Sequence, residues 1–418
     1  MRLRVDRRVV VTGLGLVTPL GIGVEANWRA LMAGQSGIGP ITHFDASLFP
    51  ARIAGEVRGF NPEDWIEKKE VKKMDLFIQF AIASADQAMR ESGFKVTPEN
   101  AERIGVLFGV GIGGLATIEE CHNIYLESGL KRVTPFFIPK LIGNLAAGHI
   151  AIRYGALGPN LATTSACASG SHAIGEAYRM IRFGYLDAAI TGGAEAAITR
   201  LGVGGFAAMR ALSTRNDEPA RASRPFDRDR DGFVIAEGAA ALILEERQSA
   251  IDRGATILAE IAGYACNGDA YHITAPSPEG RGAARCMQLC LEDSDLDPMQ
   301  VDYINAHGTS TPPGDIAETQ AIKTVFGEHA ARLAVSSTKS MTGHTLGAAG
   351  AIESAFTVLT IVRGMIPPTI NYETPDPECD LDYVPNHPRK ATVRLALNNS
   401  FGFGGTNTTL AFRPETGE

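Results

Sequence analysis

Short, wholly apolar runs recur along this 418-residue chain and constrain its fold more than any other feature. Each run ends near Gly, Asn or a polar turn, and both of its faces are apolar. This pattern is typical of central strands that helices cover on both sides. The expected strands are residues 9–11, 104–108, 188–191, 239–244, 257–264, 303–305 and 393–398.

Helical segments separate these runs. Residues 75–92 carry apolar side chains at helical spacing, and Gly93 follows as a C-cap. We expect further helices at residues 169–183, 282–291, 315–326 and 347–363. Because strands and helices mix along the chain, we predict the α/β class.

The chain shows a loose duplication. Each half has an early series of strands and ends at a glycine-rich strand exit, at residues 190–194 and again at 398–407. We therefore predict two units, residues 1–255 and 256–418. The charged segment 215–231 is interpreted as a surface loop whose solvated ion pairs add little stability.

Charge and cysteine content exclude several classes of function. The chain has 39 basic and 47 acidic residues, a net charge of −8, so it lacks the basic field that would hold nucleic acid or an anionic membrane. Its six cysteines show no C-x-x-C spacing, which disfavours a zinc site or a disulfide framework. Sparse cysteines fit a reducing compartment, and we expect a cytoplasmic protein.

The N-terminus imitates a secretory signal, with basic residues before an apolar stretch at 9–24. That stretch holds four Gly, two Thr and one Pro. We interpret it instead as a buried strand at 9–12 followed by a glycine turn. We expect no membrane span, because no stretch of about 20 residues is apolar enough.

Cys167 lies in a run of small residues, TTSACASG, directly before an expected helix. The positive end of a helix dipole lowers the pKa of a thiol, and small neighbours permit a sharp strand-to-helix turn. Cys167 is therefore a candidate nucleophile. The alternative is a buried structural cysteine, the common fate of a free thiol.

His307, in NAHGTSTPPGD, and His344, in STKSMTGHTLGAAG, each follow a strand-like run and sit among small residues. Such loops are where α/β enzymes place their chemistry. Lys339 lies five residues before His344, and Glu353 lies nine residues after it. Each histidine has the alternative of a purely structural role.

Two glycine-rich segments have both functional and structural interpretations. NNSFGFGGTN, at residues 398–407, follows a strand and offers backbone N–H groups to a developing oxyanion, or forms a structural turn. GVGIGG, at residues 109–114, matches the spacing of a dinucleotide fingerprint. That motif should open a helix at the start of a βαβ unit, and an isolated match is a weak signal. We therefore do not expect nucleotide binding.

Together these segments resemble the β-ketoacyl-acyl carrier protein synthases over almost the whole chain. The segments that carry the resemblance are VVVTGLG, TTSACASGSHAIGEA, ITGGAEA, INAHGTSTPPGD, SSTKSMTGHTLGAAGAIES and NNSFGFGGTN. Two histidines with one cysteine are similar to the elongating synthases, and NGDAYHIT, at 267–274, is similar to synthase II. The resemblance implies a homodimer with the thiolase fold. In that fold two pseudo-duplicated halves, each with a five-stranded mixed sheet, form a five-layer αβαβα stack.

The resemblance also implies a mechanism. Cys167 would take an acyl group from acyl carrier protein, with the backbone N–H groups of Cys167 and Phe401 as the oxyanion hole. His307 and His344 would stabilise the enolate formed when malonyl-carrier protein loses CO₂. Attack on the acyl-Cys167 thioester would then give a 3-oxoacyl chain two carbons longer. Phe401 also matches the family's gate to the acyl pocket.

Supporting roles follow from the same resemblance. Lys339 would set the local charge around the histidines, and Glu353 would orient that lysine. Thr309 and Thr311 match positions that contact the pantetheine arm. Ile112 matches a position that lines the acyl pocket.

The carrier protein is acidic where it is recognised. Lys69, Lys72 and Lys73, in EKKEVKK, match basic docking positions of the family, and Arg210 would join them. The alternative for these lysines is a solvated helix face. The chemistry requires no metal and no resident cofactor, because the phosphopantetheine arm arrives on the carrier protein.

Three other functions remain open. A free-standing polyketide ketosynthase would share the Cys167, His307 and His344 set. A non-catalytic partner of the same fold would tolerate the loss of Cys167. A thiol hydrolase would release free acid without chain growth.

Overall fold

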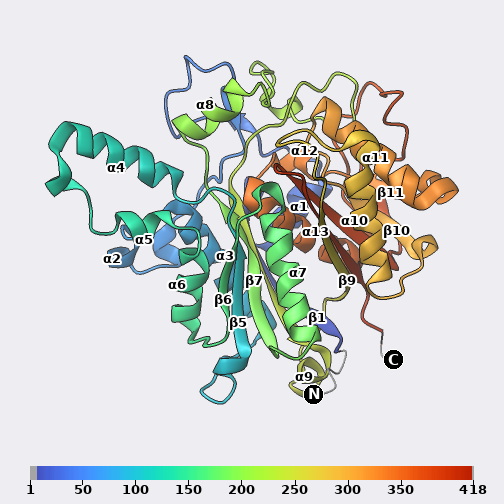
Figure 1. Ribbon diagram of the computed structural model, residues 1–418, viewed down its shortest axis with the longest axis horizontal. Helices are drawn as coiled ribbons and strands as arrows, with labels where there is room; N and C mark the ends of the chain where they lie inside the picture. Colours follow the sequence, from blue (N-terminus) through green and yellow to red (C-terminus); the bar gives the residue numbers. More distant parts are fainter. Residues whose placement is uncertain (1–6, 417–418) are drawn as a thin grey trace.

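The computed structural model describes residues 7–416 and places the main strands in one mixed sheet (Figure 1). Starting from the outer edge, the strands of the first half are β6 (Asn160–Thr163), β5 (Ile104–Gly109), β7 (Ala188–Glu195), β8 (Gly238–Glu246) and β1 (Val9–Thr18). The strands of the second half continue as β9 (Ala259–Gly268), β15 (Thr406–Arg413), β14 (Leu395–Gly402), β10 (Val301–Asn305) and β11 (Ala334–Ser336).

The two halves repeat one topology. The spatial order is β1, β8, β7, β5, β6 in the first half and β9, β15, β14, β10, β11 in the second. If the five strands of each half are numbered by their order in the sequence, both halves have the order 1, 5, 4, 2, 3. In each half the second, third and fourth strands are parallel, and the fifth strand pairs antiparallel with both of its neighbours, the first and the fourth. The halves join where residues 9–11 of β1 pair with residues 259–261 of β9. The predicted duplication is therefore confirmed in topology, and the two expected sheets are continuous.

Helices form three layers around the two halves of the sheet (Figure 1). α3 (Leu76–Ser92) covers β1, β8 and β7 on one outer side. α7 (Ser169–Arg182) and α13 (Ala349–Arg363) contact strands of both halves and fill the middle. α10 (Arg281–Glu292) covers β9 and β15, and α11 (Pro312–Phe326) packs on α10. The predicted five-layer arrangement and α/β class are confirmed.

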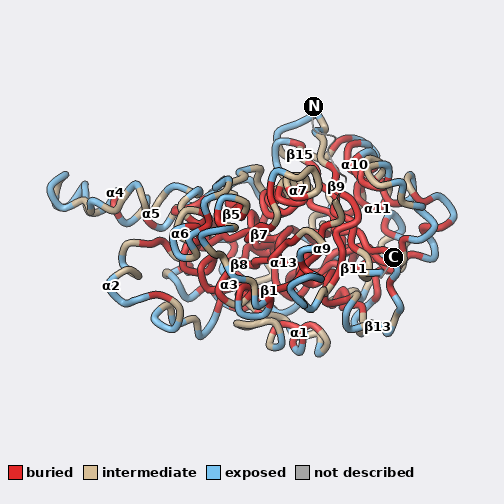
Figure 2. The backbone as a smooth tube through the Cα atoms, turned by 90° about the horizontal axis from the view of Figure 1, so that it is seen from below, coloured by how far each residue is buried: buried red, intermediate tan, exposed pale blue. Residues whose placement is uncertain are grey.

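The middle layer explains an unexpectedly apolar helix. The helical segment Leu346–Arg363 is long and apolar enough, by composition alone, to cross a membrane, contrary to the prediction that the chain holds no such segment. In the structure 83% of this segment is buried inside the protein. A helix covered on all sides must be apolar all round, so its position between the halves accounts for its composition. Figure 2 shows the same concentration of buried residues at the centre.

The glycine turn predicted after residue 12 is wrong, because β1 runs on to Thr18. Gly13 and Gly15 lie inside this strand and face the backbone of α3. A Cβ atom at Gly15 would come within 1.9 Å of the Ser84 carbonyl oxygen, and one at Gly13 within 2.3 Å of the Ala88 carbonyl oxygen. The glycines therefore serve a close helix–strand contact.

The remaining elements connect or extend these layers. The other helices are α1 (Val24–Met32), α2 (Lys68–Val71), α4 (Leu115–Ser128), α5 (Phe137–Leu141), α6 (Leu145–Tyr154), α8 (Arg200–Ala208), α9 (Arg247–Asp252) and α12 (Lys339–Thr342). The short strands are β2 (Gly21–Ile22), β3 (Gly39–Pro40), β4 (Ile53–Ala54), β12 (Met365–Ile366) and β13 (Arg389–Lys390). α4 and α5 form an arm that projects from the first half (Figure 1).

Both glycine-rich segments that were predicted to follow a strand belong partly or wholly to a strand. Residues 190–194 lie inside β7, and residues 398–402 end β14. A turn with positive φ at Gly404 and Gly405 then leads into β15, which the sequence analysis missed. The second exit is therefore a β-hairpin, and its turn carries the backbone groups described below.

Candidate active site

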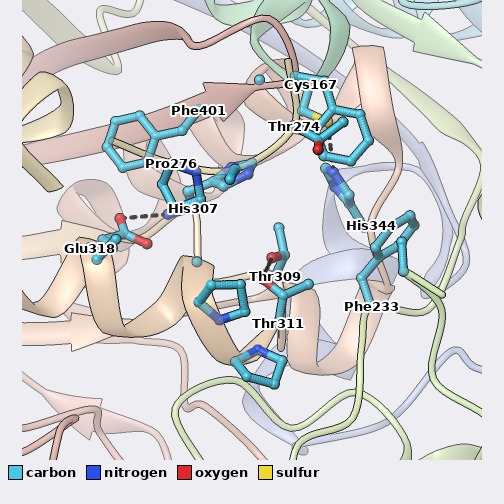
Figure 3. Close-up of a pocket in the computed structure, with 18 of the residues that line it drawn as sticks. Cys167, Phe233, Thr274, Pro276, His307, Thr309, Thr311, Glu318, His344 and Phe401 are labelled. Carbon is cyan, nitrogen blue, oxygen red and sulfur yellow. Dashed lines mark hydrogen bonds between the residues drawn. The ribbon is translucent and has the colours of Figure 1, made fainter. Parts of the chain in front are cut away.

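A cavity of about 330 Å³ is lined by residues of both halves, including the three predicted catalytic residues (Figure 3). Other predicted site residues on its wall are Thr309, Thr311, Phe401 and Arg210. Cys167 and His344 lie side by side at its wall, and His307 lies between His344 and Phe401. Residues that are far apart in the sequence thus meet in one enclosure.

Cys167 sits on a short 3₁₀ turn, Ala166–Ala168, that leads from β6 into α7. Ala166 has a φ of 50°, an unusual value for a residue with a side chain, and marks the sharp turn that the small-residue run predicted. The Thr163 hydroxyl donates to the Ser169 carbonyl oxygen and closes the turn. Cys167 is only 8% exposed.

The resting thiol is not acidified. Burial raises the pKa of Cys167 to about 12, against the opposing positive charge of Lys339. The expectation of a lowered pKa is therefore wrong for this structure, because loss of hydration outweighs the charges and dipoles nearby. Cys167 must transfer its proton to a neighbouring base in order to act as a nucleophile.

His344 provides that neighbour. Its Nε2 lies 2.9 Å from the Cys167 Sγ. The His344 backbone is fixed on both sides, since its N–H donates to the Val234 carbonyl oxygen and its carbonyl accepts from the Ala236 N–H. The Phe233 ring packs edge-on against the imidazole, with centroids 5.3 Å apart.

His307 follows β10 and lies at right angles to His344, with ring centroids 5.5 Å apart. Its backbone N–H donates to Glu318, as does that of Gly308, at 2.9 and 2.7 Å. Asn399 donates to the same carboxylate at 3.2 Å. Sequence reasoning missed Glu318, although an acidic residue on the helix after the His307 loop was a signal.

Both imidazoles are held neutral. Burial and then the positive charge of Lys339 lower the pKa of each histidine well below its ordinary value. Lys339, on α12, forms a buried ion pair with Glu353, on α13. Burial raises the pKa of Glu353 to about 7, and Lys339 opposes the shift. The two predicted supporting residues therefore lie together behind the histidines.

The amide that faces the sulfur belongs to Phe403. The backbone N–H of Phe403, at the hairpin turn, hydrogen-bonds toward Cys167 and lowers the pKa of its thiol. Phe401 lies in β14 opposite Asn407, and its ring contacts His307 with centroids 5.6 Å apart. This corrects the predicted oxyanion donor: the turn brings the second phenylalanine, not the first, to the nucleophile.

The predicted substrate-binding residues divide into two groups. Thr309 and Thr311 line the cavity, with their hydroxyl oxygens 3.0 Å apart. Ile112 instead lies outside the lining residues and is 43% exposed. Its loop, GVGIGG, gives three backbone N–H groups to the Glu195 carboxylate. This internal anion occupies the loop that resembled a nucleotide fingerprint.

The docking residues divide in the same way. Arg210 lies on the cavity wall, whereas Lys69, Lys72 and Lys73 lie on or just after α2. Two of these lysines are paired, Lys69 with Glu67 at 2.8 Å and Lys73 with Glu70 at 2.7 Å. None of these three lysines lines the cavity within one chain, in contrast to Arg210.

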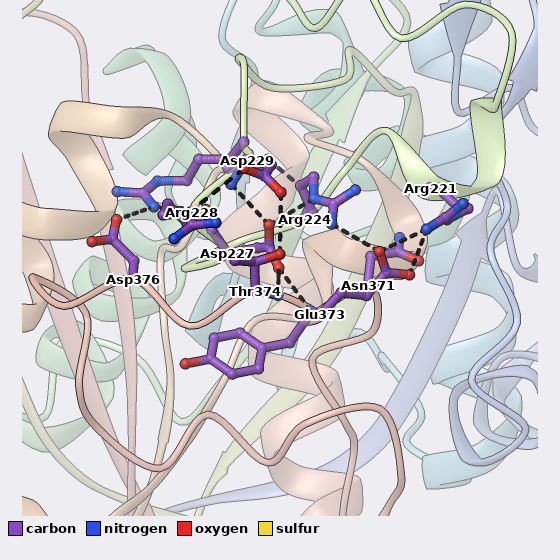
Figure 4. Close-up of polar contacts among 12 residues, drawn as sticks. Arg221, Arg224, Asp227, Arg228, Asp229, Asn371, Glu373, Thr374 and Asp376 are labelled. Carbon is purple, nitrogen blue, oxygen red and sulfur yellow. Dashed lines mark hydrogen bonds and ion pairs between the residues drawn. The ribbon is translucent and has the colours of Figure 1, made fainter.

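The charged segment 215–231 is only partly the solvated loop that was predicted: Arg221 pairs with Glu218 at the surface, but other members are buried. Arg224, Asp227 and Arg230 are buried, and Arg224 donates to Asp227 at 3.0 Å (Figure 4). Asp227 in turn accepts the backbone N–H groups of Glu373 and Thr374. The buried contacts of Arg224 and Asp227 therefore fasten this segment to the chain after β12.

Arg230 links the same segment to the cavity wall. It pairs with Asp376 at 2.6 Å and donates to the carbonyl oxygen of Pro312 at 3.1 Å. Pro312 lines the cavity next to Thr311.

In residues 7–416, no cluster of three or more His, Cys, Asp or Glu side chains is arranged to hold a metal ion.

Comparison with known proteins agrees with this geometry. Residues 6–250 match the model of the beta-ketoacyl synthase N-terminal domain, and residues 258–373 match that of the C-terminal domain. A 3-oxoacyl-[acyl-carrier-protein] synthase 2 of Synechocystis sp. is 56% identical over 407 residues, covering 97% of this chain and 98% of the relative.

Two solved structures are also similar. A beta-ketoacyl synthase from Burkholderia phymatum has a TM-score of 0.91 at 40% identity, covering 98% of this chain and 100% of that one. A type II polyketide-synthase ketosynthase, solved in complex with its acyl-carrier protein, has a TM-score of 0.90 at 38% identity, with the same coverage.

Proposed function

This chain belongs to the β-ketoacyl synthase family, and we propose that Cys167 and the two histidines divide between them the chemistry of acyl-chain extension. The protein is a condensing acyltransferase of the 3-oxoacyl-carrier-protein synthase type. It joins an acyl group to a malonyl unit by a decarboxylative Claisen condensation and lengthens a fatty acyl chain by two carbons. The observation that carries the assignment of roles is the 2.9 Å contact between Cys167 Sγ and His344 Nε2.

The first step loads the acyl group. The Cys167 thiol gives its proton to His344, which is neutral and within hydrogen-bond distance, and the sulfur attacks the carbonyl carbon of an acyl thioester. The backbone N–H groups of Cys167 and Phe403 would bind the tetrahedral oxyanion. As the carbon–sulfur bond to the carrier breaks, the departing thiolate takes the proton from His344. This leaves an acyl-Cys167 thioester and two neutral histidines.

The second step generates the nucleophile. A malonyl thioester binds with its carbonyl oxygen between His307 and His344, which each offer a neutral N–H donor. Loss of CO₂ leaves the electron pair of the broken C–C bond in an enolate, and the two donors stabilise its oxygen. Removal of one such donor typically slows an enzyme by about 10²–10³-fold.

The third step forms the new C–C bond. The enolate carbon attacks the acyl-Cys167 carbonyl, and the oxyanion returns to the Cys167 and Phe403 amides. Collapse of the tetrahedral intermediate releases the 3-oxoacyl thioester and expels Cys167 as a thiolate. The thiolate takes up one proton from solvent, which is the proton that the overall reaction consumes. Lys339 supports the second step by keeping the histidines neutral, and Glu353 pairs with Lys339. This scheme uses no resident cofactor or metal.

An acyl carrier protein is the proposed donor of both thioesters. One solved relative, 38% identical to this chain, is a ketosynthase in complex with its acyl-carrier protein. The paired hydroxyls of Thr309 and Thr311 suit the amides of a pantetheine arm in the cavity. Arg210 at the wall and Lys69, Lys72 and Lys73 on the α2 segment would attract an acidic carrier by charge complementarity.

A homodimer is a further proposal, and two surface features support it. β6 is the edge strand of the sheet, and Leu161 on it is exposed. Beside β6, helices α4–α6 and their loops expose further large apolar side chains: Ile118, Tyr125, Leu126, Leu130, Ile138, Ile142 and Ile152. A patch of this kind marks an interaction site. Pairing of two β6 edges would cover it, and Leu161→Lys should convert a dimer to monomers in multi-angle light scattering.

Placement in the cytoplasm is a further proposal. All six cysteines lie within the described residues and are free, as in a reducing compartment. The polyketide alternative draws on the 38% identical ketosynthase, but the 56% identity to a 3-oxoacyl-carrier-protein synthase 2 favours fatty-acid extension.

The test is the intact mass of the enzyme after mixing with a medium-chain acyl-carrier protein and no malonyl donor. A gain of one acyl group, absent in Cys167→Ala, supports the assigned nucleophile. Subsequent malonyl-carrier protein should release a 3-oxoacyl product two carbons longer. Acceptance of polyketide intermediates alone would favour the alternative, and release of free acid would indicate hydrolysis.

A further inference from the structure

Glu195, the last residue of β7, is completely buried yet carries an ionisable carboxylate. The carboxylate accepts backbone N–H groups from Gly111 at 2.9 Å and from Ile112 and Gly113 at 3.1 Å. A fourth N–H comes from Gly347, also at 3.1 Å. The first three donors belong to the loop after β5, and the fourth belongs to the second half of the chain.

The fourth donor connects Glu195 to the catalytic loop. Gly347 lies three residues after His344, at the 3₁₀ turn that leads into α13. Gly111, on the other side of the carboxylate, lies against the Cys167 turn, since a Cβ atom there would come within 3.3 Å of the Ala166 carbonyl oxygen. Glu195 therefore lies between the segment that carries the nucleophile and the segment that carries its base.

The glycines around Glu195 pack so closely that a Cβ atom on several of them would clash with neighbouring backbone. A Cβ atom on Gly347 would lie 2.2 Å from the Gly111 nitrogen, and one on Gly193 would lie 2.9 Å from the Gly347 carbonyl oxygen. At Gly170 the Cβ atom would meet the Ala351 nitrogen at 2.9 Å. The halves thus pack closely here, largely through backbone atoms, and the Glu195 carboxylate accepts hydrogen bonds from both halves.

We infer that Glu195 is a positioning residue. Its four backbone hydrogen bonds tie the loop 111–113, which packs against the Cys167 turn, to the His344 loop and so keep the turn and the loop in register. The role rests on the proposed function, because the register matters through the contact between Cys167 and His344. A carboxylate suits the position since its two oxygens only accept hydrogen bonds when ionised. In a glutamine, the NH₂ group would replace one of these oxygens. It would then face backbone N–H groups with which it cannot form hydrogen bonds.

The test compares Glu195→Gln with Glu245→Gln. Glu245 is a matched control because it is almost equally buried on the neighbouring strand β8. It lies at the other end of the β7–β8 pair, opposite Ala188, and is paired with Arg253 at 2.6 Å. Misplacement of reacting groups by about 1 Å can cost about 10²-fold. Glu195→Gln should lower the kcat of condensation by about tenfold to a hundredfold. The KM for acyl-carrier protein should change less, by about twofold at most, because Glu195 does not line the cavity.

A second measurement does not depend on condensation. The negative charge of Glu195 raises the pKa of the Cys167 thiol, so Glu195→Gln should shift the pH profile of iodoacetamide alkylation at Cys167 to lower pH. Glu195→Asp keeps the charge and should leave that profile in place, while its shorter side chain still lowers kcat. This variant also serves if the glutamine protein does not fold.

Two outcomes would overturn the inference. One is a kcat, per folded enzyme, within twofold of the wild type in both Glu195 variants. The other is an equal loss of kcat in Glu245→Gln, which would indicate general damage to the sheet. Failure of the proposed function would look different, because the wild-type enzyme itself would then form no acyl-enzyme.

Discussion

Lys339 and Glu353 form an ion pair whose side chains are only 1% and 3% exposed, directly behind the two catalytic histidines. Two opposite charges are costly to bury, and an apolar pair of similar shape often gives equal stability. The lysine has a consequence that an apolar residue would lack, since its charge lowers the pKa of both His307 and His344. The pair is therefore better explained by the chemistry of the site than by stability.

Lys339→Met should change the pH dependence of the enzyme. Removing the positive charge lets the pKa of both histidines rise, so they become protonated at higher pH than in the wild type. Decarboxylation of malonyl-carrier protein requires neutral histidines, and its acid limb should therefore move to higher pH. The measurement is the rate of CO₂ release between pH 5 and 9. An unmoved acid limb would remove Lys339 from this role.

The same variant should lose stability, because Glu353 is left buried without a partner. Breaking one side of a buried pair typically costs about 3–5 kcal/mol. The double variant Lys339→Met/Glu353→Gln should recover much of the free energy of unfolding, measured in urea, yet keep the altered pH profile. If the double variant were as unstable as the single one, packing and not charge would explain the loss.

His307→Ala should separate the two half-reactions. His307 lies beside His344, while the 2.9 Å contact to the Cys167 sulfur belongs to His344 alone. Loading of Cys167, followed by intact mass, should therefore continue. Decarboxylation should fall by about 10²–10³-fold, the usual effect of removing one donor to an oxyanion. Equal slowing of both steps would show that His307 supports the whole site.

The sequence predicted the architecture well because its apolar runs are short and continuous. Of the ten main strands, β6, β11 and β15 were missed for physical reasons. β6 is an exposed edge strand without an apolar run, β11 is only three residues long, and β15, TNTTLAFR, is half polar. The turn predicted after residue 12 failed because glycines in β1 allow close packing of α3, a relationship that no local pattern reveals.

The sequence also predicted the main residues of the site but not the contacts that hold them in place. Motifs identified the cysteine and both histidines, and the structure brings them together at one cavity. Sequence could not tell which phenylalanine of FGFGG turns its amide toward Cys167, because that depends on where the hairpin turns. Nor could it show that Glu318 and Glu195 hold the loops, since their partners are backbone groups distant in the chain.

Two arginines of the charged segment 215–231 should behave very differently (Figure 4). Arg224 is buried and pairs with Asp227, whereas Arg228 is 61% exposed. Arg224→Ala leaves Asp227 buried with one partner fewer and should cost about 3–5 kcal/mol. Arg228→Ala should change the free energy of unfolding by about 0.5 kcal/mol or less. Equal effects in urea unfolding would support the solvated loop that the sequence suggested.

His43 should make stability fall as the pH rises above about 6.5, the ordinary pKa of histidine. Its Nε2 lies 2.9 Å from Glu237, and its Nδ1 lies 3.7 Å from Glu56; both carboxylates are buried. The hydrogen bond to Glu237 is the largest cause of a pKa of His43 raised above its ordinary value of 6.5. The folded protein therefore holds this proton more tightly than the unfolded chain does.

The sign of the effect follows directly. A raised pKa contributes stability that is fully present below the unfolded pKa of about 6.5 and is lost as the pH rises through the folded pKa. His43→Gln should therefore lower the Tm at pH 6 and approach the wild type near pH 9. His122→Gln, at an exposed position on α4, is the control and should show no such trend. A His43→Gln deficit that stays constant from pH 6 to 9 would mean that the imidazole acts by shape and not by charge.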